Sequence, residues 1–165
     1  MQFDEFAAAR LGALLQYATV LSGDAETARD LVQEALTRAF VHWGRITAAE
    51  HPYAYVRMIL TNVYVSSRRR RVWPVSRLAG DAIDDPPAPD PSAGAVQRVD
   101  LRRALLALPR AQRAAIVLRY LEGLPDTEIA ETLACRPATV RSHIHRGLAA
   151  LRVNDHLRAE EGATS

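Results

Sequence analysis

Residues 124–152 read LPDTEIAETLACRPATVRSHIHRGLAALR, and this stretch decides the fold of the second half of the chain. Apolar residues recur three or four positions apart on either side of residues 134–136, which is the spacing of one buried helix face. They are Ile129, Ala130 and Leu133 before the turn and Val140, Ile144 and Leu148 after it. Pro137 suits the first turn of the second helix, where its missing N–H has no bond to lose. The pattern predicts a helix-turn-helix.

The outward face of the second helix is polar or basic, and no acid occurs from residue 132 to residue 154. A solvated helix usually mixes Glu with its Arg, whereas a helix that neutralises phosphates and reads base edges needs a face of this kind. We therefore expect this helix to enter the major groove of duplex DNA. The candidate residues are Arg136, Ala138, Thr139, Arg141, Ser142, His143, His145 and Arg146. His143 and His145 do not share a helix face, so we expect no metal site there.

The whole chain has 165 residues, a net charge of +2 and 48% apolar residues, enough for a packed core. All 21 basic residues are Arg, which suits phosphate and guanine recognition but equally fits GC-rich codon usage. The single cysteine, Cys135, excludes an internal disulfide, and we expect it to be a small apolar plug beside the turn. The N-terminus lacks signal-peptide features, and no apolar run reaches the roughly 18 residues of a membrane span. We expect a soluble, cytoplasmic protein without a membrane segment.

Residues 81–91 read DAIDDPPAPDP and divide the chain. Proline fixes φ and lacks a donor, so this acidic segment predicts a linker, which we place at 73–97. Residues 1–72 and 98–155 then form two small helical domains, and we expect a disordered tail at 156–165. The predicted fold is therefore all-α, with a helical bundle joined to a helix-turn-helix domain by an extended linker.

The first domain shows three helical stripes, and no strand pattern interrupts them. A stripe from Phe3 to Leu21 ends at a break, and Asp24 is a good N-cap for the next stripe, which runs to Phe40. A loop is expected at 45–51, followed by a helix from Pro52 to an arginine run at 68–71. In the second domain, Pro109 and Gly123 end two further stripes ahead of the helix-turn-helix.

Three motifs carry a family resemblance: DLVQEAL at 30–36, PYAYVRMILTN at 52–62, and EIAETL with ATVRSHIHRGLAALR at 128–152. With the arginine run, they resemble the sigma factors of bacterial RNA polymerase, and more narrowly the two-domain extracytoplasmic-function (ECF) class. The resemblance covers residues 1–72 and 98–153. It implies a promoter-specificity subunit that binds core polymerase, recognises the −35 and −10 elements and helps to melt the promoter. It implies no catalysis and no cofactor.

For the core enzyme, the resemblance implies that DLVQEAL docks on the clamp helices of the β′ subunit. Asp30, Gln33 and Glu34 would meet basic and polar groups there, with Leu31 or Leu36 adding apolar contact. Taken alone, these residues also fit an ordinary amphipathic helix. A second contact would hold the tip helix of the β flap on a surface that includes Leu105, Leu108 and Leu124.

For the −10 element, the resemblance implies a site that holds a base outside the DNA stack, which needs an apolar or aromatic pocket and polar groups for the base edge. The loop at 45–51 and Asn62 are the pocket candidates, and Tyr53 or Tyr55 could stack on a base, although one of them fits the core. The arginines would follow phosphates, although the run at 68–71 also fits a solvated helix end. The candidate set is Arg45, His51, Tyr53, Tyr55, Arg57, Asn62, Arg68, Arg69 and Arg70.

Several readings stay open beside this one. The acidic linker could enter the polymerase cleft or act as a plain tether, and an anti-sigma factor could mask these surfaces. A free-standing regulator would share the helix-turn-helix but has no evident use for DLVQEAL, and no catalytic motif indicates an enzyme.

Two departures from the family pattern concern the turn. Ala134 stands where the family usually has Gly, so we expect a differently shaped turn. Arg136 and Pro137 replace a more usual Ser-containing cap.

Overall fold

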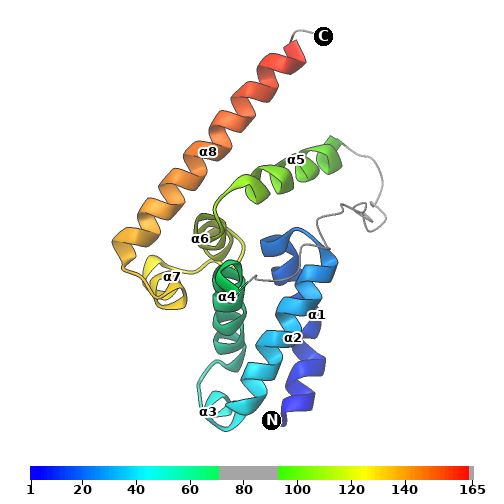
Figure 1. Ribbon diagram of the computed structural model, residues 1–165, viewed down its shortest axis with the longest axis vertical. Coiled ribbons are helices and arrows are strands. Elements are labelled where there is room, and N and C mark those ends of the chain that lie inside the picture. The colour runs from blue at the N-terminus through cyan, green and yellow to red at the C-terminus, as the bar shows by residue number, and fades with distance from the viewer. Residues whose placement is uncertain (71–92, 164–165) are drawn as a thin grey trace.

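The computed structural model describes residues 1–70 and 93–163, and within them the side chains of 1–66 and 100–156. Every regular element in that part of the chain is a helix, which confirms the all-α prediction (Figure 1). The helices are α1 (Phe3–Ser22), α2 (Ala25–Val41), α3 (Trp43–Thr47), α4 (Pro52–Arg70), α5 (Ala93–Ala107), α6 (Arg110–Tyr120), α7 (Asp126–Leu133) and α8 (Pro137–Ala163).

The first lobe consists of α1, α2 and α4 packed side by side, with α3 across one end. Its core is formed by apolar side chains that follow the predicted stripes, among them Phe6, Leu14, Leu21, Val32, Val56 and Leu60. Gly23, at a φ of 84°, ends α1, and Asp24 begins α2 by accepting a hydrogen bond from the Thr27 N–H at 2.9 Å. The predicted break and N-cap are therefore confirmed.

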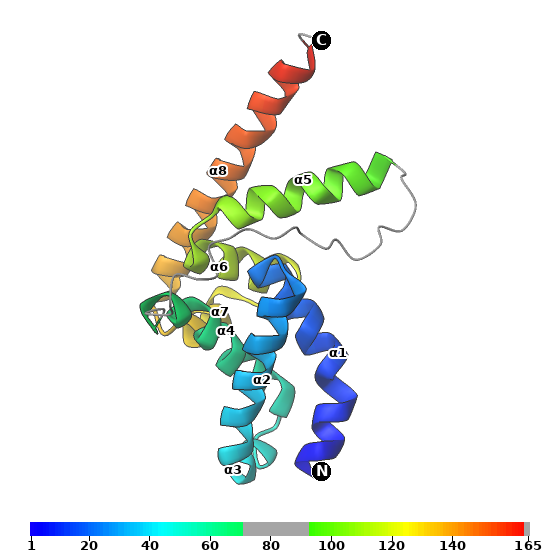
Figure 2. The ribbon, with the colours of Figure 1, turned by 45° about the vertical axis from the view of Figure 1, so that its right-hand side comes forward.

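The second lobe consists of α6, α7 and the first half of α8, with α5 alongside. Leu118, Ile129 and Val140 are fully buried at its centre. Gly147 lies where α8 crosses α6. Glycine allows this close approach, since a Cβ at that position would lie 2.5 Å from the Ile116 side chain. Beyond this crossing, α8 extends away from the rest of the molecule (Figures 1 and 2).

Three element boundaries differ from the prediction. α3 occupies part of the expected loop at 45–51, because fully buried Ile46 anchors a helical turn there. α5 begins at Ala93, inside the expected linker, because residues 92–108 contain four alanines and no proline. α8 continues to Ala163 through the expected tail, because Leu, Arg, Ala and Glu extend a helix that has already nucleated.

Candidate nucleic-acid interface and docking groove

The helix-turn-helix is formed by α7, a turn at 134–136 and α8. Ala134 adopts the left-handed conformation, with φ 51° and ψ 47°, and is the only non-glycine residue with positive φ in the described part of the chain. The Cys135 N–H closes the turn on the Ala130 carbonyl at 3.0 Å, and its partly buried thiol packs against the core. The expectation of a differently shaped turn was therefore wrong, because alanine accepts the left-handed backbone that glycine usually supplies.

The outward face of α8 presents most of the predicted base-reading residues to solvent. Val140 and Ile144 anchor the helix from its buried side. Thr139 and His143 are half-buried, and burial, together with the nearby Arg146 charge, lowers the pKa of His143. At neutral pH this imidazole therefore offers one donor and one acceptor rather than two donors. The exposed residues are Arg136, Ala138, Arg141, Ser142, His145 and Arg146.

An acid that sequence reasoning missed joins this face from the preceding helix. Asp126, at the start of α7, lies 3.7 Å from the Arg141 guanidinium and also pairs with Arg119 of α6. The acid-free run covers the end of α7, the turn and most of α8, whereas the folded surface brings Asp126 from the start of α7 beside Arg141. Arg141 keeps 63% of its side chain exposed, so it remains open to a ligand while Asp126 attracts it from one side.

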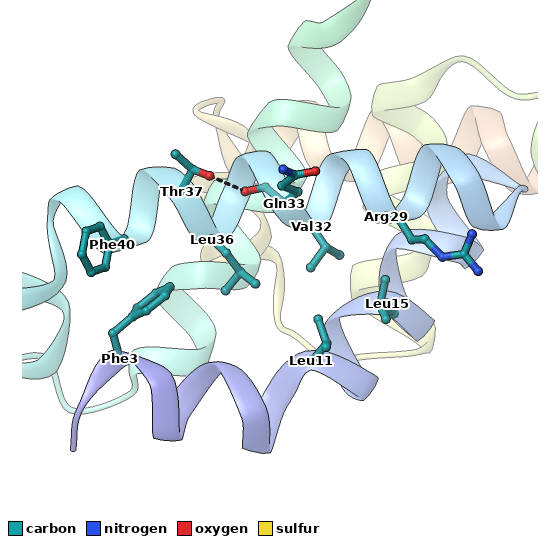
Figure 3. A pocket seen from close by; sticks show the side chains of 9 residues that line it. All are labelled: Phe3, Leu11, Leu15, Arg29, Val32, Gln33, Leu36, Thr37 and Phe40. Carbon is teal, nitrogen blue, oxygen red and sulfur yellow. Dashed lines mark hydrogen bonds between the residues drawn. The ribbon is translucent and has the colours of Figure 1, made fainter.

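The first lobe carries an open apolar groove of about 600 Å³ between α1 and α2. Figure 3 shows Leu36 and Val32 of α2 facing Leu11 and Leu15 of α1 across it. The Phe3 and Phe40 rings meet edge-on at its end, 5.1 Å apart, although Phe40 remains 62% exposed. Sequence reasoning missed the α1 wall, because the apolar stripe identified on this helix did not include Leu11 and Leu15.

The predicted core-binding residues of α2 are placed differently from one another. Gln33 lines the groove, and Asp30 and Glu34 are exposed beside it. Glu34 also pairs with Arg38 one turn further on, at 2.5 Å. Leu31 is buried in the lobe, so it supports the helix from inside.

A smaller pocket of about 360 Å³ lies where α1 meets the segment between α3 and α4. His51 and Tyr53, both predicted candidates, line it together with Arg10, which sequence reasoning missed. The Arg10 guanidinium lies 5.4 Å from the centre of the Tyr53 ring. The other lining residues are Met1, Phe6, Glu50, Pro52 and Ala54.

The remaining −10 candidates lie outside this pocket. Arg45 on α3 and Tyr55 and Asn62 on α4 are exposed, whereas Arg57 is only 8% exposed and pairs with Glu122 of the second lobe at 2.5 Å. Arg68, Arg69 and Arg70 belong to α4, but their side chains lie outside the described residues, as do Arg71 and the acidic segment at 81–91.

The predicted β-flap residues are largely covered. Leu108 is buried, and Leu105 and Leu124 are partly buried against the core. In the described residues, no group of three or more His, Cys, Asp or Glu side chains is arranged to hold a metal ion. No helix in the same segments combines the length and apolar character needed to cross a membrane.

Comparison with known proteins matches both lobes. Residues 6–74 match the family model for sigma-70 region 2, and residues 98–151 match that for sigma-70 region 4. The RNA polymerase sigma-E factor of Streptomyces coelicolor is 32% identical, over 92% of this chain and 85% of the relative. The ECF RNA polymerase sigma factor SigL of Mycobacterium tuberculosis is 33% identical over the same shares.

One solved structure matches nearly the whole chain. It is the sigma factor RpoE in complex with the anti-sigma factor NepR from Bartonella quintana, which is 27% identical in sequence. The match has a TM-score of 0.71 and covers 92% of this chain and 95% of that one.

Proposed function

The chain belongs to the ECF sigma factors of the sigma-70 family, promoter-recognising subunits of bacterial RNA polymerase, and we propose that its lobes divide the promoter between them. The second lobe reads the −35 element, and the first lobe binds the −10 element and core polymerase. The observation that carries this division is the helix-turn-helix of the second lobe, whose segment at 136–152 exposes four arginines and contains no acid.

At the −35 element, α8 enters the major groove of duplex DNA. Its N-terminal residues reach base edges, as in other helix-turn-helix proteins. Arg141 suits a bidentate contact to guanine, and Arg136 and Arg146 suit phosphates. The half-buried Thr139 and neutral His143 add short polar contacts close to the helix axis.

Core polymerase docks on the groove between α1 and α2. An open apolar groove fits the apolar face of an amphipathic helix, and we assign the β′ clamp helices to it because α2, one wall of the groove, carries the DLVQEAL motif. Phe40, Leu36 and Leu11 would bury their exposed carbon against that helix. Asp30, Glu34 and Gln33 would meet its basic and polar groups along the rim.

Promoter melting takes place on α4 and the segment that precedes it. A flipped base needs a small pocket with an aromatic wall and polar groups, and the pocket beside His51, Tyr53 and Arg10 offers both. Asn62 and Tyr55, exposed on α4, would hold neighbouring bases of the opened strand outside the stack.

The chain acts as a binding subunit in the cytoplasm and leaves catalysis to the polymerase. The known relatives are named as sigma factors, which supports this role. The structural relative was solved with an anti-sigma factor, and we extend that kind of partner to this chain. Co-purification of the tagged full chain from its own cells would identify the partner.

Run-off transcription with purified core polymerase tests the proposal. The wild-type chain should produce promoter-specific transcripts, and neither the chain alone nor core polymerase alone should do so. The Asp30→Arg, Glu34→Arg double variant should lose binding to core polymerase, whereas the same reversals at exposed Glu131 and Asp155 of the second lobe should retain it. Full core binding by the Asp30, Glu34 double variant would contradict docking on α2.

A further inference from the structure

The two lobes are held together by arginines of the second lobe that bind carbonyl groups of the first. Arg113 donates to the Leu21 carbonyl at 2.7 Å, and Arg102 donates to the Gly23 carbonyl. The end of a helix leaves carbonyls without intrahelical partners, so the C-terminus of α1 is a natural site for cations. The arginines therefore fasten the second lobe to the end of α1.

A similar contact lies on α4. The Arg110 guanidinium donates to the Tyr64 carbonyl at 2.6 Å and lies 5.0 Å from the centre of the Tyr64 ring. Leu106 also packs directly against Gly23, where a Cβ would collide with the leucine side chain. The contact between the lobes is thus closely fitted on both α1 and α4.

The Arg57–Glu122 pair differs from these contacts, because here the first lobe supplies the cation. Arg57 projects from α4, the helix assigned to the −10 element, and Glu122 follows α6 in the second lobe. Their side chains are 10% and 17% exposed, so the guanidinium is closed to any other large anion. A carboxylate and a phosphate offer a guanidinium the same geometry of acceptor oxygens.

We propose that Glu122 occupies Arg57 in place of a promoter phosphate, so that the free chain holds itself closed and −10 binding requires the lobes to part. This inference rests on the proposed role of α4 in DNA binding. Removing one partner of a buried pair leaves an uncompensated charge. In a two-lobed chain that cost is relieved by opening, which returns Arg57 to water. The Arg57–Glu122 pair, here called the latch, thus favours the closed chain, and a DNA phosphate can replace Glu122 as the partner of Arg57.

The test compares charge-removing variants of the full chain in two measurements. Small-angle X-ray scattering reports the radius of gyration, and fluorescence anisotropy reports binding of a short labelled single-stranded DNA of mixed sequence. Glu122→Gln should increase the radius of gyration and tighten DNA binding roughly five-fold or more, the lower end of typical coupling between sites. Arg57→Gln should also open the chain but should not tighten binding, because the phosphate ligand is gone.

Glu131→Gln is the matched control, since it removes an exposed charge from the same lobe. It should leave the radius of gyration unchanged and alter binding only slightly. Thermal melting confirms that each variant is folded. If Glu122→Gln does not fold, Arg110→Gln should open the chain and tighten binding through the same equilibrium.

Two results would overturn the latch: a radius of gyration for Glu122→Gln equal to that of Glu131→Gln, or opening without tighter DNA binding. Failure of the wild-type chain in run-off transcription is a separate outcome. It would contradict the proposed division of the promoter, whereas scattering would still report whether Glu122 closes the chain.

Discussion

Ala134 holds a backbone conformation that L-residues avoid, at the point where α7 gives way to α8. A left-handed conformation costs a non-glycine residue roughly 1–2 kcal/mol. Its side chain is exposed, so no buried contact of its methyl group compensates for that cost. The conformation is instead fixed by its surroundings, including the Cys135 N–H bond to the Ala130 carbonyl and the start of α8 at Pro137.

Replacing Ala134 with glycine should therefore stabilise the chain. We expect Ala134→Gly to raise the free energy of unfolding by about 1 kcal/mol, because the strain relieved exceeds the entropy that glycine gains when unfolded. Urea denaturation followed by circular dichroism measures the change. Ala149→Gly, at an exposed position within α8, should instead lower stability by about 1 kcal/mol. A loss of stability in Ala134→Gly would show that the turn does not strain alanine.

Tyr17 links α1 to α4 through a buried hydrogen bond. The Thr61 hydroxyl donates to the Arg57 carbonyl at 2.8 Å, so the Tyr17 hydroxyl donates to the Thr61 oxygen, also at 2.8 Å. Burial raises the pKa of Tyr17 above its ordinary value of 10.0, and the bond to Thr61 only partly offsets this. The folded state therefore keeps the phenol neutral at a pH where the unfolded chain ionises it.

Tyr17→Phe tests this bond and its pH dependence together. At pH 7 the variant should lose about 1 kcal/mol of stability, the typical net value of such a bond. As the pH rises above 10, the wild type should lose stability, because its unfolded state releases the Tyr17 proton. The variant should lose less, so the gap between them should narrow. Tyr120→Phe, at an exposed phenol, should match the wild type at each pH, and a constant gap for Tyr17→Phe would refute the assignment.

At the level of elements, helical periodicity identified the long helices because their buried stripes are regular. It failed where other forces set the boundary. α3 is only five residues long, too short for a periodic signal, and depends on one buried residue, Ile46. The extension of α8 to Ala163 depends on propagation from an existing helix. Because the end of the chain is polar and contains glycine, its composition did not indicate a helix there.

The candidate sites show the same division. The outward face of α8 follows from sequence because a helix with one buried stripe must expose the opposite face. The apolar groove does not follow, because it forms between α1 and α2, and the periodicity of one helix does not show which of its leucines will line an open groove against another. Asp126 likewise reaches Arg141 only through the angle between α7 and α8.

The recognition helix yields a prediction about one base pair. Arg141→Ala should weaken binding to the −35 element by about 1–3 kcal/mol and relax the preference at a single position, as loss of a bidentate base contact does. Competition binding against a library of −35 variants measures both effects. Arg152→Ala, which removes the same charge further along α8, should leave the preference unchanged. Uniform weakening by Arg141→Ala across all sequences would instead identify a phosphate contact.

Across the whole molecule, contacts between distant residues decide which predicted surfaces are open. Arg57 and Glu122 are 65 positions apart, and the local sequence around either residue does not predict that the two will pair. A stripe indicates that a helix face is buried, but it does not say whether its own lobe or the other lobe buries it. For this reason the sequence predicts Arg57 as a phosphate ligand, whereas in the folded chain it is paired with Glu122; Asn62, five residues further along α4, is exposed.

Asn62 therefore offers a test of promoter melting by the whole assembly of chain, core polymerase and DNA. If its amide holds a base outside the stack, Asn62→Ala should slow open-complex formation on duplex promoters by roughly ten-fold, equivalent to about 1.4 kcal/mol. On promoters with a pre-melted −10 region the loss should be much smaller, because unstacking is already complete. Gln16→Ala, at an exposed position on α1, should affect neither substrate. An equal loss on duplex and pre-melted promoters would mark Asn62 as a general DNA contact, since only a group that stabilises the flipped base can distinguish a closed helix from an open one.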